Sequence, residues 1–159
     1  MSKANKRQVG GNHYRISGSS IELWDLLGPE YVRGLAVKYV SRWRRKGGVQ
    51  DLEKALHCCE KLCEMIADGA VNSCAHDHVT ADGVCRRMLL SMIEHSAIVS
   101  LLCWRDEKDI RGVMQIVQLW IAVTQEIDGA QQRDLFETSE NAAQQDTDQD
   151  VSEVRWRHQ

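Results

Sequence analysis

The sequence predicts an all-α protein built from two pairs of helices. Along four stretches, apolar residues recur at spacings of three and four, which is the periodicity of one helix face. No stretch alternates apolar and polar residues as a half-buried strand does. We therefore expect a helical hairpin over 29–46 and 49–67, followed by a second helix pair over 84–104 and 107–128.

Proline and glycine mark the ends of the predicted hairpin helices. A short helix over 21–27 should end at Gly28, and Pro29 suits the first position of the next helix. The Gly47-Gly48 pair then ends that helix. Because this turn is so short, we expect the two long helices to pack antiparallel. Their apolar stripes contain Val32, Leu35, Ala36, Tyr39, Val40 and Trp43 on the first helix, and Leu52, Ala55, Leu56, Cys59 and Ile66 on the second.

The second helix pair should follow a loop over 68–83. The segment over 84–104 is apolar along most of its length and is expected to form a single packed helix. Asp106 is expected to cap the next helix, whose first turn is acidic. That helix should end near Gly129.

The two ends of the chain differ in charge. The net charge is −3, yet residues 1–48 carry ten Lys and Arg against three acids, whereas residues 129–159 carry seven acids against three Arg. We expect a basic disordered lead over 1–8, a nucleotide-binding module over 9–67, helices over 84–129 and an acidic disordered tail over 130–159. With no secretory signal and no apolar run of membrane-spanning length, the cytoplasm is the expected location.

The strongest functional signal is the basic end of the first long helix. Arg33, Lys38, Arg42, Arg44, Arg45 and Lys46 occur with no acid between Tyr31 and Gln50. Lys38 and Arg42 are four residues apart, and Arg45 is expected on the same helix face. The glycine turn leads into a helix start, where free N–H groups, among them that of Gly48, favour anions. Phosphate is the natural partner, and the alternative is a solvated basic face.

A glycine-punctuated stretch near the N-terminus is a second, weaker signal. Gly10 and Gly11 would let a backbone approach a ligand closely, His13 could transfer a proton near neutral pH, and Tyr14 could stack on a base. A tight turn with a packed tyrosine explains the same residues equally well.

These blocks resemble a bacteriophage family. The resemblance covers roughly residues 8–66 and is carried by Val9-Gly10-Gly11-Asn12-His13-Tyr14, Trp24-Asp25, Lys38-Tyr39-Val40-Ser41-Arg42, Lys46-Gly47-Gly48 and Asp51-Leu52-Glu53-Lys54-Ala55. The family is known mostly as a phage domain of unknown function, and it includes the nucleotide kinase of a short-tailed coliphage. The resemblance implies a host-cytoplasmic phage protein that binds nucleotides and forms oligomers.

The resemblance also implies where the site residues lie. Asp51 and His13 would be the catalytic residues, with Asp51 holding Mg²⁺ or accepting a proton. An acid in the first turn of a helix is also typical of simple dipole compensation, and that alternative stays open. The residues expected to bind nucleotide or phosphate are Gly10, Gly11, Tyr14, Lys38, Arg42, Arg45, Lys46, Gly48 and Lys54.

Three functions fit these observations. The first is a deoxynucleoside monophosphate kinase that uses Mg²⁺, although the chain has no G-x-x-x-x-G-K-[ST] phosphate loop. The alternative is a non-catalytic sponge that sequesters the cyclic nucleotide signals of host antiviral immunity. The third, nucleic-acid binding, is disfavoured by the net negative charge and the single basic surface. A homo-oligomer that does not contact a membrane is expected in each case.

Overall fold

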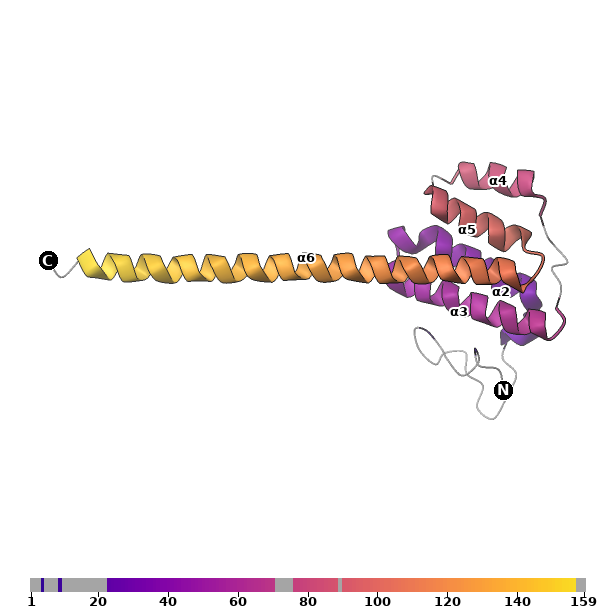
Figure 1. Ribbon diagram of the computed structural model, residues 1–159, viewed down its shortest axis with the longest axis horizontal. Helices are drawn as coiled ribbons and strands as arrows, with labels where there is room; N and C mark the ends of the chain where they lie inside the picture. Colours follow the sequence, from indigo (N-terminus) through magenta and orange to yellow (C-terminus); the bar gives the residue numbers. More distant parts are fainter. Residues whose placement is uncertain (1–3, 5–8, 10–22, 71–75, 89, 157–159) are drawn as a thin grey trace, which may run out of the picture. The chain divides into compact units, whose positions relative to one another are not determined.

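The computed structural model describes residues 4, 9, 23–70, 76–88 and 90–156. Every element in this part of the chain is a helix, which confirms the all-α prediction. The elements are α2 (Leu23–Arg42), the 3-10 turn η1 (Trp43–Arg45), α3 (Gly48–Ala67), α4 (His78–Arg86), α5 (Met92–Cys103) and α6 (Glu107–Trp156) (Figure 1).

Helix α2 contains the break that the sequence predicts near its start. Gly28 has a φ of 79°, a left-handed conformation that glycine adopts at little cost and other residues avoid. Pro29 follows it and begins the long segment of the helix. The first turn of α2 therefore points differently from the rest, as expected for a short helix ending at Gly28.

The other end of α2 differs from its prediction. The sequence indicates a helix to Lys46, but the α-helix ends at Arg42 and the chain tightens into η1. The N–H of Lys46 donates to the carbonyl of Arg42 at 3.1 Å, which closes this turn before α3 begins. The change of helix type rotates the side chains after Arg42 away from the α2 face, because a 3-10 turn has fewer residues per turn than an α-helix.

The predicted helix over 84–104 is wrong, because two helices occupy this region. Helix α4 begins at His78, inside the predicted loop over 68–83, and Asp77 caps it by accepting a hydrogen bond from the N–H of Thr80 at 2.9 Å. Helix α5 begins anew at Met92 behind a capping box formed by Ser91 and Glu94. Such a box stabilises a new helix start at Ser91, so it favours two separate helices over one continuous helix.

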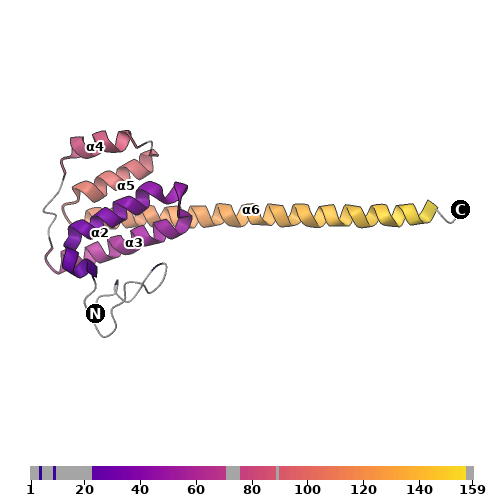
Figure 2. The same ribbon diagram turned by 180° about the vertical axis from the view of Figure 1, so that it is seen from behind.

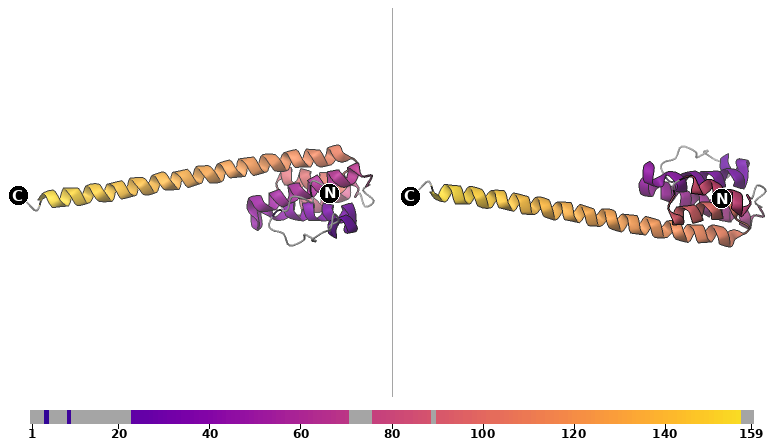
Figure 3. Two further views of the ribbon diagram at one scale, coloured as in Figure 1. Left: turned by 90° about the horizontal axis from the view of Figure 1, so that it is seen from below. Right: turned by 90° about the horizontal axis from the view of Figure 1, so that it is seen from above.

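The helices of residues 1–121, which form one compact unit, pack around an apolar core. Helix α5 lies between α4 and α2, and α2 lies between α5 and α3 (Figures 1 and 2). Figure 3 shows these helices gathered together from two further directions. The first turns of α6 add Ile110, Val113 and Val117 to the same core.

Helix α6 continues well beyond its predicted end. The sequence predicts a helix to 128 and a disordered tail over 130–159, whereas α6 extends to Trp156. Residues 130–156 contain no glycine or proline, the two residues least compatible with a helix interior, and include five glutamines, three alanines and three glutamates, which favour helix. Residues 122–159 form a second unit of their own.

Five cysteines in the described part of the chain are free thiols: Cys58, Cys59, Cys63, Cys85 and Cys103. Burial raises the pKa of Cys58 to about 12 and that of Cys63 to about 11. These thiols stay protonated at neutral pH and act as small apolar core residues. Among the described residues, no helix combines the length and the apolar character that crossing a membrane requires.

Two glycines of α2 should respond oppositely to alanine. Gly34 lies in the helix interior, and a methyl group there would meet nothing within 4 Å, so Gly34→Ala should raise the free energy of unfolding by about 0.5–1 kcal/mol. Gly28→Ala should lower it by about 1–2 kcal/mol, because alanine is strained at positive φ. Urea denaturation measures both, and equal effects of the two substitutions would contradict the break at Gly28.

Candidate functional site

Three cations from two helices surround one aromatic ring at the end of α2. The guanidinium carbon of Arg42 lies 5.0 Å from the centre of the Tyr39 ring, and the Nζ atoms of Lys38 and Lys54 lie at 5.8 and 5.9 Å. Lys38 and Arg42 come from α2, whereas Lys54 comes from α3. We name these four residues, together with Asp51, the Tyr39 cluster.

Asp51 is the acid of this cluster and is only 1% exposed. Arg42 binds it in a forked arrangement, with Nε at 2.9 Å from Oδ2 and the second guanidinium nitrogen at 3.1 Å from Oδ1. The Nζ of Lys54 is 3.9 Å from Oδ1 of the same carboxylate. The hydrogen bond with Asp51 raises the pKa of Arg42 above its usual value. Arg42 is therefore held by the protein itself.

The space beside the first turn of α3 is occupied by the carboxylate of Asp51. A Cβ atom on Gly47 would lie 2.2–2.5 Å from the carboxylate atoms of Asp51. The carboxylate thus occupies the space beside the first turn of α3, where the sequence predicts an external phosphate. This geometry favours the structural interpretation of Asp51, which the sequence leaves open beside the catalytic one.

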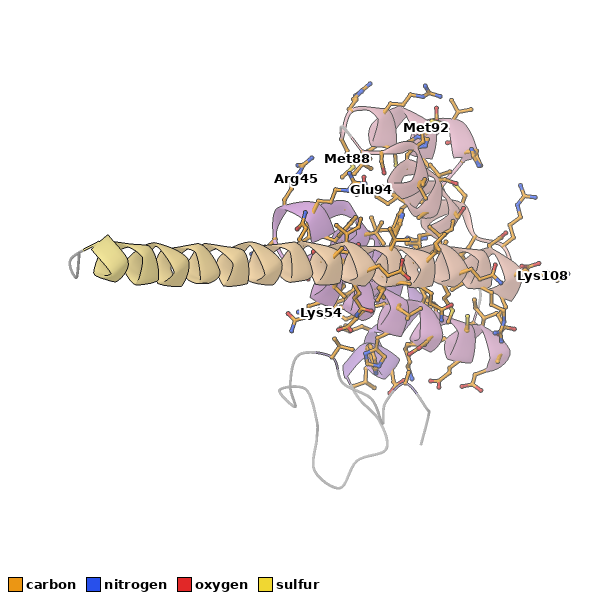
Figure 4. All side chains as sticks on the ribbon, turned by 60° about the vertical axis from the view of Figure 1, so that its left-hand side comes forward. Arg45, Lys54, Met88, Met92, Glu94 and Lys108 are labelled. Carbon is orange, nitrogen blue, oxygen red and sulfur yellow. The ribbon has the colours of Figure 1, made fainter. Side chains whose placement is uncertain are left out.

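The remaining predicted cations fall into two groups. Lys38 is exposed and Lys54 is half-buried, and Nζ of Lys54 donates to Oε1 of Gln50 at 3.2 Å. Arg45 lies elsewhere, because its guanidinium donates to the carbonyl of Met88 at 3.3 Å (Figure 4). The prediction that Arg45 shares a face with Lys38 and Arg42 is therefore wrong, and the early end of α2 is the reason.

Several predicted site residues are not part of the cluster as the structure describes it. Lys46 and Gly48 are exposed, and Gly48 has a positive φ of 52° in the turn. The glycine-punctuated stretch lies outside the described residues, and with it the predicted Gly10, Gly11, His13 and Tyr14.

Glu94 connects the η1 turn to the start of α5, a role that was not predicted from the sequence. It is 5% exposed and accepts from the Trp43 indole at 2.7 Å, from Nε of Arg44 at 3.0 Å and from the N–H of Ser91 at 2.8 Å. Burial alone would raise the pKa of Glu94, but these hydrogen bonds and the charge of Arg44 outweigh it and hold the pKa below its usual value. Trp43 also stacks on Trp120 of α6 at 6.1 Å between ring centres.

A second polar group of residues lies at the opposite ends of α2 and α3. The Nζ of Lys61, a residue 3% exposed, is 2.5 Å from Oδ1 of Asp25 and 3.8 Å from Oε2 of Glu64. Lys61 also lies over the ring of Trp24, and Trp24 meets the buried His57 edge to face at 5.1 Å. We name these five residues the Lys61 cluster. Trp24 and Asp25 lie within one of the sequence motifs, whereas the other three residues, His57, Lys61 and Glu64, were not predicted to form a site.

Ala4 contacts this cluster. Ala4 is 2% exposed, its N–H donates to Oε1 of Glu64 at 2.9 Å, and Nε2 of His57 donates to its carbonyl at 2.7 Å. At this residue the structure differs from the disordered lead expected over 1–8. The reason is that side chains of α3 satisfy both backbone polar groups of this residue.

The described residues contain no group of three or more His, Cys, Asp or Glu side chains placed to hold a metal ion. Comparison of the chain with protein-family models, with curated proteins and with solved structures finds no match.

Asp51 and Arg42 should stabilise the fold as a coupled pair. Arg42→Ala would leave a buried carboxylate without its main partner, so it should lower the free energy of unfolding by clearly more than the exposed control Lys38→Ala does. Asp51→Ala should also lower it, but by less, because the guanidinium of Arg42 is partly exposed to water. The double variant should lose clearly less free energy of unfolding than the sum of the losses in the two single variants. Denaturation of all four proteins measures this coupling, with Lys38→Ala as the exposed control. If the losses in the two single variants simply add in the double variant, the two residues do not stabilise the fold as a pair.

Glu94 should contribute stability that acid removes. Because its pKa is lowered by folding, the contribution is fully present above its usual pKa of 4.5 and is lost as the pH falls through the folded-state pKa. Glu94→Gln should therefore be less stable than the parent at pH 7, and the difference should shrink steadily below pH 4.5. Denaturation between pH 3 and 7 tests this, with the exposed Glu126→Gln as control. A difference that stays constant across this range would refute the role.

Proposed function

We propose that the chain is a binding module for a phosphate-bearing nucleotide, which the Tyr39 cluster takes up without turnover. The observation that carries the proposal is the convergence of Lys38, Arg42 and Lys54 on one aromatic ring from two helices. Cations and an aromatic face are the groups that a phosphate and a base require.

The charge of the cluster supports an anionic ligand. Its three cations stand against one acid, Asp51, so the cluster has a surplus of two positive charges (3 − 1 = 2). Like charges at this spacing repel each other unless a counter-ion joins them. A phosphate monoester carries close to two negative charges at neutral pH, and a cyclic dinucleotide carries one on each of its two phosphodiester groups, so either ligand matches the surplus.

The state of Asp51 supports binding over phosphoryl transfer. A catalytic carboxylate must reach Mg²⁺ or the attacking oxygen. Both oxygens of Asp51 are already within hydrogen-bond distance of Arg42, and the residue is buried. Of the functions expected from sequence, we therefore favour the nucleotide sponge over the kinase.

The test is equilibrium dialysis of the full chain with a panel of cyclic nucleotides and deoxynucleoside monophosphates. We expect binding without Mg²⁺, release of the unchanged nucleotide on heating, and at least a tenfold loss of affinity in Lys54→Ala and in Lys38→Ala. Lys108→Ala, which removes an exposed lysine from the start of α6, is the matched control (Figure 4).

Two outcomes would overturn the proposal. One is formation of a nucleoside diphosphate when ATP and Mg²⁺ are added, lost in Asp51→Asn, which would establish the kinase. The other is equal affinity of Lys54→Ala, Lys38→Ala and Lys108→Ala, which would place any nucleotide elsewhere on the chain.

A further inference from the structure

We propose that the Lys61 cluster is a binding site for a peptide main chain, and that Ala4 of this chain is its exchangeable occupant. The proposal is independent of nucleotide binding, because this cluster lies at the opposite ends of α2 and α3 from the Tyr39 cluster.

The site recognises both backbone polar groups of a single residue, Ala4. A carboxylate accepts the N–H of Ala4, and an imidazole nitrogen donates to its carbonyl. Glu64 and His57 are seven residues apart on α3, so they lie on the same helix face two turns apart. The contact joins residues distant in sequence, and no local turn accounts for it.

The residues around Ala4 form a buried polar site, which distinguishes this contact from ordinary apolar packing. His57 and Lys61 are buried, and Trp24 packs against both of them. Burying a charged ammonium and a carboxylate side by side is costly unless hydrogen bonds complete them. The N–H of Ala4 supplies one of those bonds to Glu64, so the site is completed by an incoming main chain.

Recognition through the main chain predicts that the occupant can be supplied from outside. The side chain of Ala4 is a single methyl group, so most of the specific contacts come from backbone atoms. The natural segment has the advantage of being tethered to the site, which gives it a high effective concentration. A free peptide of the same sequence should therefore bind once the contact between Ala4 and the Lys61 cluster is weakened.

The test uses the full chain carrying Ala4→Pro, which removes the N–H that Glu64 accepts. A fluorescent synthetic peptide of residues 1–8 should bind this variant and show little binding to the parent chain, measured by anisotropy. The same peptide with N-methylalanine at position 4 should bind about tenfold or more weakly, because it lacks the same donor. Glu64→Gln in the Ala4→Pro chain should weaken binding of the unmodified peptide similarly, whereas Glu53→Gln on the same helix should not.

Equal binding of the two peptides would mean non-specific attraction of a basic peptide and would overturn the proposal, as would no binding at all. A second measurement covers the case that Ala4→Pro fails to fold. In the otherwise unaltered chain, Glu64→Gln should speed tryptic cleavage of the Lys3–Ala4 bond by about tenfold, since cleavage requires Ala4 to leave the site. An unchanged rate relative to Glu53→Gln would overturn the proposal independently.

Discussion

The buried carboxylate of Asp51 is the constraint on which the end of α2 and the start of α3 depend. A charge almost completely removed from water must find its partners within the protein. Arg42 provides two of them, so α2 must end where its last residue can reach across the turn. Gly47 provides the space, because any side chain there would collide with the carboxylate. One acid thus determines the length of α2, the glycine in the turn and the register of α3.

Two other buried charged residues connect the chain in the same manner. Glu94 holds the η1 turn against the start of α5, and Lys61 holds the start of α2 against α3. The core between these contacts is formed largely by small residues such as Ala36, Val40 and Ala55, which can pack in more than one register. We infer that the ion pairs select one register among those that the apolar stripes allow.

The helical class, the break at Gly28 and the position of α3 could be predicted from sequence, because periodicity and glycine act locally. The division between α4 and α5 could not be read from periodicity, since residues 84–104 are apolar along most of their length. Its one local signal is the capping box of Ser91 and Glu94. The roles of Asp51, His57 and Lys61 depend on which side chains lie across the helix pair, and sequence spacing along one helix does not contain that information.

The same carboxylate that shapes the turn also determines the charge that a ligand meets. Without Asp51, the cations around Tyr39 would have a surplus of three positive charges, and Arg42 would be free to swing towards solvent. With it, Arg42 is fixed beside the ring and the surplus falls to two, close to the charge of one phosphate monoester. A site arranged before its ligand arrives loses less conformational entropy on binding. An ion pair between Asp51 and Arg42 that stays intact therefore favours ligand binding. Catalysis by Asp51 would require this ion pair to break, so that the carboxylate could reach Mg²⁺ or the attacking oxygen.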